Sequence, residues 1–89
     1  MVIRVATFDQ RPAGHDDEAT MAEFRAWMKA QPGFRAGWHT TDAKSGKTLS
    51  ISVWDSLAAM HALKTQVFPG KPIALKPDKV EIFDKTVEF

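Results

Sequence analysis

Two stretches with a period of two, joined by a short connection that contains glycine, constrain the fold of this chain most. Residues 34–41 read FRAGWHTT and residues 49–54 read LSISVW, so larger apolar residues alternate with small or polar ones. This period is typical of β-strands whose two faces meet different surroundings. Residues 42–46, DAKSG, suit a hairpin turn. The two stretches are therefore predicted to pair with each other.

The segments at the two ends of the chain predict two further strands. Residues 2–8 and 80–89 are short and rich in β-branched and aromatic residues. The segment 68–79 carries three prolines, which disfavour regular structure and leave either a lid or a simple connection.

Two amphipathic segments are predicted helices. The first begins after an N-cap at Asp16 or Asp17 and ends near residue 31, and the second begins after Asp55 or Ser56. Apolar residues at helical spacing are Met21, Phe24, Trp27 and Met28 in the first, and Met60, Leu63 and Val67 in the second. The resulting order, βαββαβ, predicts one α+β domain over residues 1–89. It is the ferredoxin-like plan, a four-stranded antiparallel sheet with two helices on one face.

The predicted hairpin register is the one that buries apolar residues of the two strands together. An even-length loop over residues 43–46 sets Trp38 opposite Ile51 and His39 opposite Ser50. Because helices need an apolar floor, the face predicted beneath them carries Phe34, Ala36, Trp38, Leu49, Ile51 and Val53. The opposite face then carries Arg35, Gly37, His39, Ser50, Ser52 and Trp54.

That second face predicts a homodimer. A chain of 89 residues buries only about 60–65% of its unfolded surface, and without cysteine it has no disulfide to compensate. Trp54 is predicted on the face away from the helices, together with Phe83 of the last strand. A second copy of the sheet would cover both side chains. A bulge in the last strand is the competing explanation for Phe83.

Charge and composition exclude several classes of function. The 12 basic and 11 acidic residues are dispersed, and no apolar run approaches a membrane span, so neither nucleic acid nor a membrane is an expected partner. The three histidines lack ligand spacing and cysteine is absent, so no metal site is expected. No signal peptide is recognisable at the first residues, and a cytoplasmic location is the expectation.

Several positions resemble the antibiotic biosynthesis monooxygenase-like (ABM) family. The matching residues are Pro32, Gly33, Phe34, Trp54, Ser56 and Ala59. The resemblance implies a dimeric α+β barrel, in which two ferredoxin-like sheets pack face to face. It also implies a cofactor-independent monooxygenase acting on a small aromatic or quinone-type substrate. The alternative is a dimer that binds a small molecule, or only holds its own structure, without catalysis.

The chain departs from two branches of that family. It has no Asn, has Leu63 near the position of the helix-two Trp and has no His beyond His61, so it does not resemble the haem-degrading members. It also lacks the Asn and Tyr that the polyketide monooxygenases place near their substrate. The resemblance therefore predicts the fold more strongly than the reaction.

The candidate site residues fall into three groups. His39 is the candidate general base, with Arg35 and Ser50 nearby, because an imidazole titrates near neutral pH. An interface histidine in the dimer is the structural alternative. The substrate pocket is predicted from Phe24, Trp27, Met28, Trp38, Met60 and Leu63. The dimer barrel is predicted from Arg35, Ser50, Ser52, Trp54 and Phe83.

One charged residue lies inside a predicted strand. Arg4 has apolar neighbours and is expected to pair with Glu81 or Asp84 of the last strand. An anionic ligand group is the alternative partner.

Overall fold

The computed structural model describes residues 1–9, 18–70 and 76–89. The elements follow the predicted βαββαβ order, which is confirmed. They are β1 (Val2–Phe8), α1 (Glu18–Lys29), β2 (Phe34–Thr41), β3 (Thr48–Trp54), α2 (Leu57–Ala62) with a 3₁₀ turn at Leu63–Thr65, and β4 (Lys79–Phe83). The predicted N-caps Asp16 and Asp17, and much of the proline-rich connection, lie outside the described residues.

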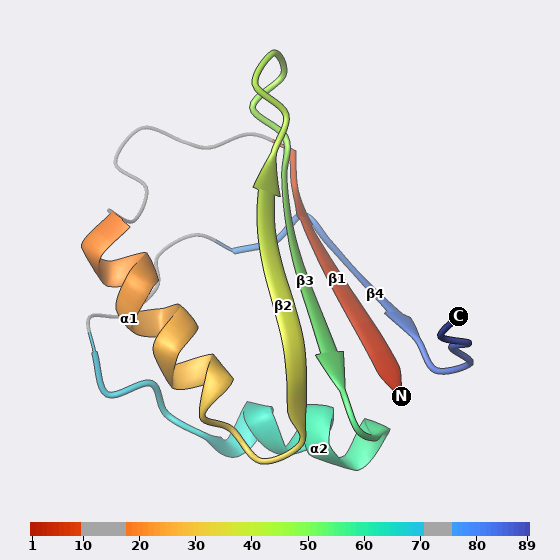
Figure 1. The fold of residues 1–89 in the computed structure, drawn as a ribbon. Helices are drawn as coiled ribbons and strands as arrows, with labels where there is room; N and C mark the ends of the chain where they lie inside the picture. The colour runs from red at the N-terminus through yellow and green to blue at the C-terminus, as the bar shows by residue number, and fades with distance from the viewer. Residues whose placement is uncertain (10–17, 71–75) are drawn as a thin grey trace.

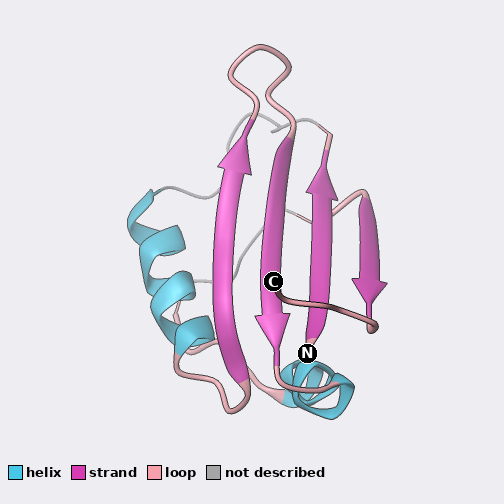
Figure 2. Cartoon of the chain, turned by 45° about the vertical axis from the view of Figure 1, so that its right-hand side comes forward, coloured by secondary structure: helices cyan, strands magenta, loops and turns pink. Residues whose placement is uncertain are grey.

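The four strands form one antiparallel sheet in the order β2-β3-β1-β4. Figure 2 shows β1 and β3 in the centre and the hairpin of β2 and β3 extending beyond the other strands. Helix α1 runs along one face beside β2, and α2 lies across the end of the sheet where β3 finishes (Figure 1). The ferredoxin-like fold is therefore confirmed.

The hairpin register is also confirmed, since Trp38 pairs with Ile51 and His39 with Ser50. The register shifts once, between Phe34 and Ala36, so the bulge lies in β2 and not in the last strand. A bulge adds one residue to one strand and changes which side chains share a face. Phe34 consequently lies on the face opposite to Ala36.

The assignment of the two hairpin faces was wrong, because it is reversed in the structure. Trp54 has no exposed surface and packs with Val2 and Met60 in the core beneath the helices. The ring of Phe34 meets the Trp54 indole edge-on at 5.4 Å between ring centroids. The Trp54 indole Nε1–H donates to the Ser52 hydroxyl at 2.9 Å, so its polar atom is satisfied in the core.

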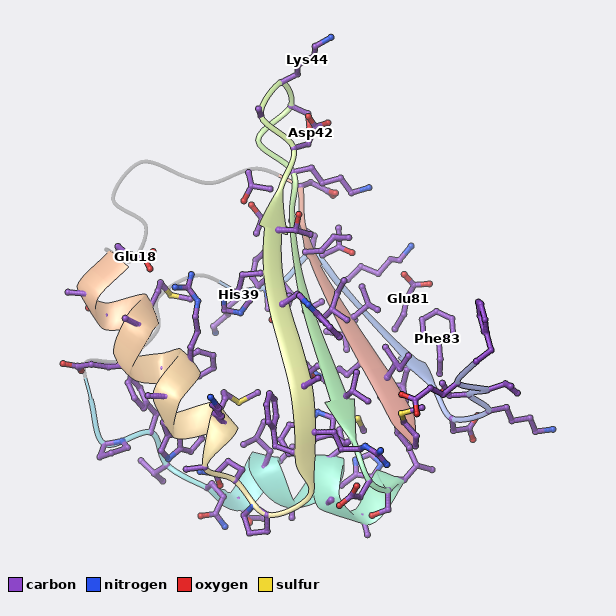
Figure 3. All side chains as sticks on the ribbon, in the orientation of Figure 1. Glu18, His39, Asp42, Lys44, Glu81 and Phe83 are labelled. Carbon is purple, nitrogen blue, oxygen red and sulfur yellow. The ribbon has the colours of Figure 1, made fainter. Side chains whose placement is uncertain are left out.

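The face away from the helices carries the aliphatic set. The cross-strand pairs Ile3 with Val53 and Trp38 with Ile51 alternate with the residues that face the helices. Phe83 pairs with Ile3 and points away from α1, as Figure 3 shows. We call this surface the open face.

Two elements are shorter than predicted. Strand β4 ends at Phe83 and does not continue to Phe89, because its last partner on β1 is Ile3 and β1 begins one residue before that. Helix α2 tightens into the 3₁₀ turn after Ala62, so the predicted buried stripe ends at Leu63 and Val67 is 84% exposed.

Gly33 connects the turn between α1 and β2 with the turn between β3 and α2. Its φ of 82° is in the left-handed region, and its carbonyl accepts the Asp55 N–H at 2.8 Å. A Cβ at position 33 would lie 2.5 Å from the Ala59 Cβ of α2. Glycine therefore allows both the turn after α1 and the close approach of α2, whose predicted cap Ser56 accepts the Ala59 N–H at 3.1 Å.

Candidate ligand-binding cleft

A cleft of about 540 Å³ lies between α1 and the β2–β3 hairpin. Helix α1 forms one wall with Phe24 and Met28, which are four residues apart and so share a helix face. Phe34 of β2 adds a third apolar side chain, and Ser50 and Ser52 of β3 are polar residues of the sheet wall. A space with apolar walls and a few polar groups is typical of small-molecule sites.

Gly37 gives the Phe34 ring its place in this wall. A Cβ at position 37 would lie 3.0 Å from the Phe34 Cζ and 3.4 Å from the Ile51 carbonyl oxygen. These are tighter than ordinary contacts, so the glycine keeps the sheet side of the cleft clear for the ring.

His39 is the titratable group of the sheet wall, and it points toward α1 (Figure 3). Its Nδ1 accepts a hydrogen bond of 2.9 Å from the Arg25 Nε. The Arg25 Nη1 donates in turn to the Glu18 Oε1 at 2.5 Å. One arginine of α1 thus links an acid on its own helix to the imidazole on the sheet.

The Arg25 contact fixes how His39 can act. A neutral imidazole that accepts at Nδ1 carries its hydrogen at Nε2, and an imidazolium donates at both nitrogens and cannot accept from Arg25. In this arrangement His39 accepts from Arg25 at Nδ1, and its Nε2–H can donate to a ligand. It becomes a proton acceptor at Nδ1 only when Arg25 moves away from that nitrogen.

The predicted substrate residues separate into four places. Phe24 and Met28 line the cleft, whereas Met60 and Leu63 pack in the core around Trp54. The remaining two, both tryptophans, lie elsewhere.

Trp27 belongs to an aromatic cluster on α1. Its ring centroid is 5.9 Å from that of Phe24 and 5.6 Å from that of Phe68. Trp38 borders the cleft where β2 passes it, but alternation with His39 turns its side chain to the open face, where it is 56% exposed.

The expectation that the barrel residues share the open face is corrected in the same way. Ser50, Ser52 and Arg35 line the cleft, and Trp54 is in the core. Phe83 is the member of that set that lies on the open face. The physical reason is that burying the large Trp54 indole, whose N–H has a hydrogen-bond partner, stabilises the fold more than burying Ile51 and Val53 would. These β-branched residues are also well suited to the surface of a sheet.

The predicted site did not include the cleft residues Arg25, Lys29, Phe34, Ala36, Gly37 and Ile51, and Arg25 and Lys29 are the charged ones among them. Both line the cleft and are four residues apart on α1, immediately after Phe24 and Met28. Arg25 and Lys29 form a basic row beside the apolar row of Phe24 and Met28 at helical spacing. This pattern does not by itself indicate a binding site, because basic residues beside an apolar stripe are ordinary at the surface of a helix.

Two classes of site are not found in the described part of the chain. No group of three or more His, Asp or Glu side chains there is arranged to hold a metal ion. Among the same residues, no helix is long and apolar enough to cross a membrane.

Comparison with solved structures places the fold beside one family. A Chloroflexus aurantiacus protein assigned to the antibiotic biosynthesis monooxygenases superposes with a TM-score of 0.69 at 16% identity, covering 99% of this chain and 95% of that one. A Deinococcus radiodurans protein with the same assignment gives 0.58 at 18% identity, covering 100% and 96%. A Streptomyces coelicolor monooxygenase, solved in complex with nanaomycin D, gives 0.56 at 17% identity, covering 99% and 89%.

These likenesses confirm the ABM-like fold over essentially the whole chain. Sequence comparison adds nothing to it, since no protein-family model and no curated protein matches the chain. At such identities a shared fold does not carry over a substrate or a reaction.

Proposed function

We propose that the cleft binds a small aromatic molecule and that the chain catalyses its oxidation by O₂ without a bound cofactor. The observation that carries the proposal is the cleft itself, in which Phe24, Met28 and Phe34 face a His39–Arg25 pair. An aromatic ring fits the apolar walls, and an oxygen substituent fits the polar pair. The S. coelicolor monooxygenase, whose fold this chain shares, was solved with nanaomycin D, which supports binding of a small molecule by this fold.

The proposed reaction converts an activated CH₂ that is conjugated with a carbonyl through flanking aromatic rings, as in an anthrone, into a second ketone. His39 takes a proton from the CH₂ at Nδ1 once Arg25 turns from that nitrogen to the enolate oxygen. The enolate gives an electron to O₂, and the two radicals combine to form a peroxide anion. This anion takes the proton back from His39 and becomes a hydroperoxide. Loss of water from the hydroperoxide leaves the ketone. The balance is R₂CH₂ + O₂ → R₂C=O + H₂O, so one oxygen atom enters the product.

Binding without catalysis is the second candidate, and one contact favours it. The His39 Nδ1 lone pair already accepts a hydrogen bond from Arg25, so it cannot take a proton from a substrate. His39 can then only donate from Nε2. A chain that keeps this contact with ligand present would bind an aromatic molecule and leave it unchanged.

Oxygen uptake with a panel of anthrones and hydroquinones tests these candidates. We expect His39→Ala to lower the rate by about a hundredfold or more if His39 transfers the proton. His61→Ala is the matched control, because His61 is exposed on α2 and is not among the residues that line the cleft. Equal rates for both variants would contradict the role of His39.

The same panel separates catalysis from binding. No uptake together with a raised melting temperature in the presence of an aromatic ligand would leave the binding candidate. No uptake and no thermal shift with any compound would contradict both.

The open face supports a second proposal, that two copies pack their sheets face to face. Trp38 and Phe83 are 56% and 50% exposed on a surface that also carries Ile3 and Ile51, with Lys79 and Glu81 of β4 at its edge. Apolar residues on the outer face of a sheet indicate that this face is covered. Trp54 is buried within the single chain and no longer supports the predicted dimer. The proposal of a dimer now depends on Trp38 and Phe83.

A further inference from the structure

The cleft is lined by cations and not by acids. Arg25 and Lys29 of α1 and Arg35 of the β2 bulge are among its lining residues, and none of the described lining residues is Asp or Glu. The chain as a whole is nearly neutral, with a net charge of +1, so the composition does not explain this bias. Opposite charges are expected on whatever occupies such a cleft.

Two of these cations have acidic partners that lie outside the cleft. Glu18 accepts from Arg25, and its side chain is 77% exposed. Asp55 lies 3.5 Å from Arg35, a long ion pair between exposed groups, which contributes little. Lys29 has no ion pair with any residue that the structure describes. Positive charge on the cleft wall is therefore only partly balanced.

Arg4 adds a cation to the same side of the sheet. It pairs with Ser52 across β1 and β3 and is two residues from each of the buried residues Val2 and Ala6, so it shares their face beneath the helices. Burial lowers the pKa of its guanidinium. The expected pairing with Glu81 is wrong, because Glu81 lies opposite Val5, on the other face, and pairs with Lys79 at 3.3 Å.

We propose that the ligand of this cleft is an aromatic molecule that carries an anionic group, a carboxylate or an ionised phenol. Its ring lies against Phe24 and Met28, and its anion lies between Lys29 and Arg35. Both arginine and lysine bind carboxylates well, and the arginine fork can do so with two parallel hydrogen bonds. The inference deepens the proposed function, because it names the substrate class for the same cleft.

The pairing of the two rows on α1 supports this class over a purely apolar ligand. The apolar pair Phe24 and Met28 and the basic pair Arg25 and Lys29 follow each other at the same four-residue spacing. A molecule held by the apolar row therefore has the basic row beside it along its length. A neutral hydrocarbon would leave these cations without a ligand partner.

Calorimetric titration with 2-naphthoate and its neutral analogue 2-naphthamide tests the inference. The wild-type chain should bind the naphthoate about tenfold more tightly than the amide. Lys29→Gln should reduce that preference by about threefold, and Lys29→Glu should abolish it. Lys44→Gln is the matched control, since Lys44 lies at the tip of the hairpin, far from His39 (Figure 3), and should leave the preference unchanged.

Salt provides a second reading of the same experiment. The Debye length falls from about 30 Å to about 3 Å between about 0.01 M and about 1 M salt, so the preference for naphthoate should shrink over that range. Binding of the amide should change much less.

Equal affinities for the two compounds, or an unchanged preference in Lys29→Glu, would overturn the inference. Oxygen uptake with neutral anthrones together with equal affinities would leave the proposed reaction standing without this substrate class. A charge-dependent preference with no oxygen uptake would leave the ligand class standing without the reaction.

Discussion

At the scale of single residues, the Trp54–Ser52 pair holds the core and the cleft together. The indole is fully buried, and its single donor is satisfied by a serine that also lines the cleft. A buried donor without a partner costs more than an ordinary hydrogen bond contributes. Ser52 is therefore needed for stability as well as for the shape of the cleft.

Replacing this serine gives a specific prediction. Ser52→Ala should lower the free energy of unfolding by about 1–3 kcal/mol, because it leaves the Trp54 Nε1–H unpaired in the core. Ser50→Ala is the control, on the same strand and face, and should change it by less than about 0.5 kcal/mol. Urea denaturation measures both, and equal losses would show that the hydrogen bond is not the reason.

His39 shows where sequence reasoning about a single residue stops. The residue type and its strand position marked it as a candidate for proton transfer, and the structure does place it in the cleft wall. Its contact with Arg25 joins positions 14 residues apart on different elements. No local pattern in the sequence encodes that contact, although it decides which ring nitrogen carries the hydrogen.

At the scale of elements, the apolar pattern predicted the strand register correctly but not the faces. Pairing of Trp38 with Ile51 follows from matching the apolar residues of the two strands across a loop of even length. Each face of the hairpin carries apolar residues: Trp54 lies on one face, and Ile51 and Val53 lie on the other. The face that meets the helices is the one whose burial stabilises the fold more. The sequence pattern predicted the aliphatic face beneath the helices, whereas the structure buries the Trp54 indole there.

The bulge in β2 is a second reason for the reversed faces. Strict alternation puts Phe34 with Trp38, but the shift between Phe34 and Ala36 moves the ring to the helix side. Gly37 is a signal for a bulge, since glycine inside a strand often marks one, but it does not show at which residue the register shifts. The apolar spacing of Phe24 and Met28 on α1, by contrast, was sufficient to place both in the cleft.

The corner at Gly33 gives a prediction for the packing of α2. Gly33→Ala should lower the free energy of unfolding by about 1–2 kcal/mol for the left-handed φ, and by a further 1–3 kcal/mol or so for the clash with Ala59. Gly46→Ala shares a positive φ, 78°, but its Cβ would meet nothing within 4 Å.

Gly46→Ala therefore isolates the cost of the backbone from the cost of the clash. Chemical denaturation of both variants measures the difference. If the two lost the same stability, the close approach of α2 to the corner would not limit the residue at position 33.

At the scale of the whole molecule, the two faces of the sheet have different surfaces. The helix side combines a packed core at one end with a polar and cationic cleft along α1. The open face carries aliphatic and aromatic residues on β1, β2 and β3, with Trp38 and Phe83 half exposed, and the Lys79–Glu81 ion pair on β4 at its edge. This division suits one face for a ligand and the other for a second copy of the chain.

The proposed dimer predicts the effect of a charge on the open face. Trp38→Lys should convert the dimer into a monomer at micromolar concentration, because a buried lysine without a partner opposes association. Val67→Lys is the control, since Val67 is already 84% exposed and lies after α2. Light scattering gives the mass of each, and a wild-type monomer at the same concentration would contradict the dimer.

The central claim is that the cleft between α1 and the hairpin holds an aromatic anion, and its most direct test is a nuclear magnetic resonance titration with 2-naphthoate. If the ligand lies there, amide signals of Gly37, His39 and Ser52 and of the 24–29 segment should shift together, while those of the hairpin tip at residues 42–46 stay fixed. Shifts confined to the open face, or no shifts at millimolar ligand, would contradict it.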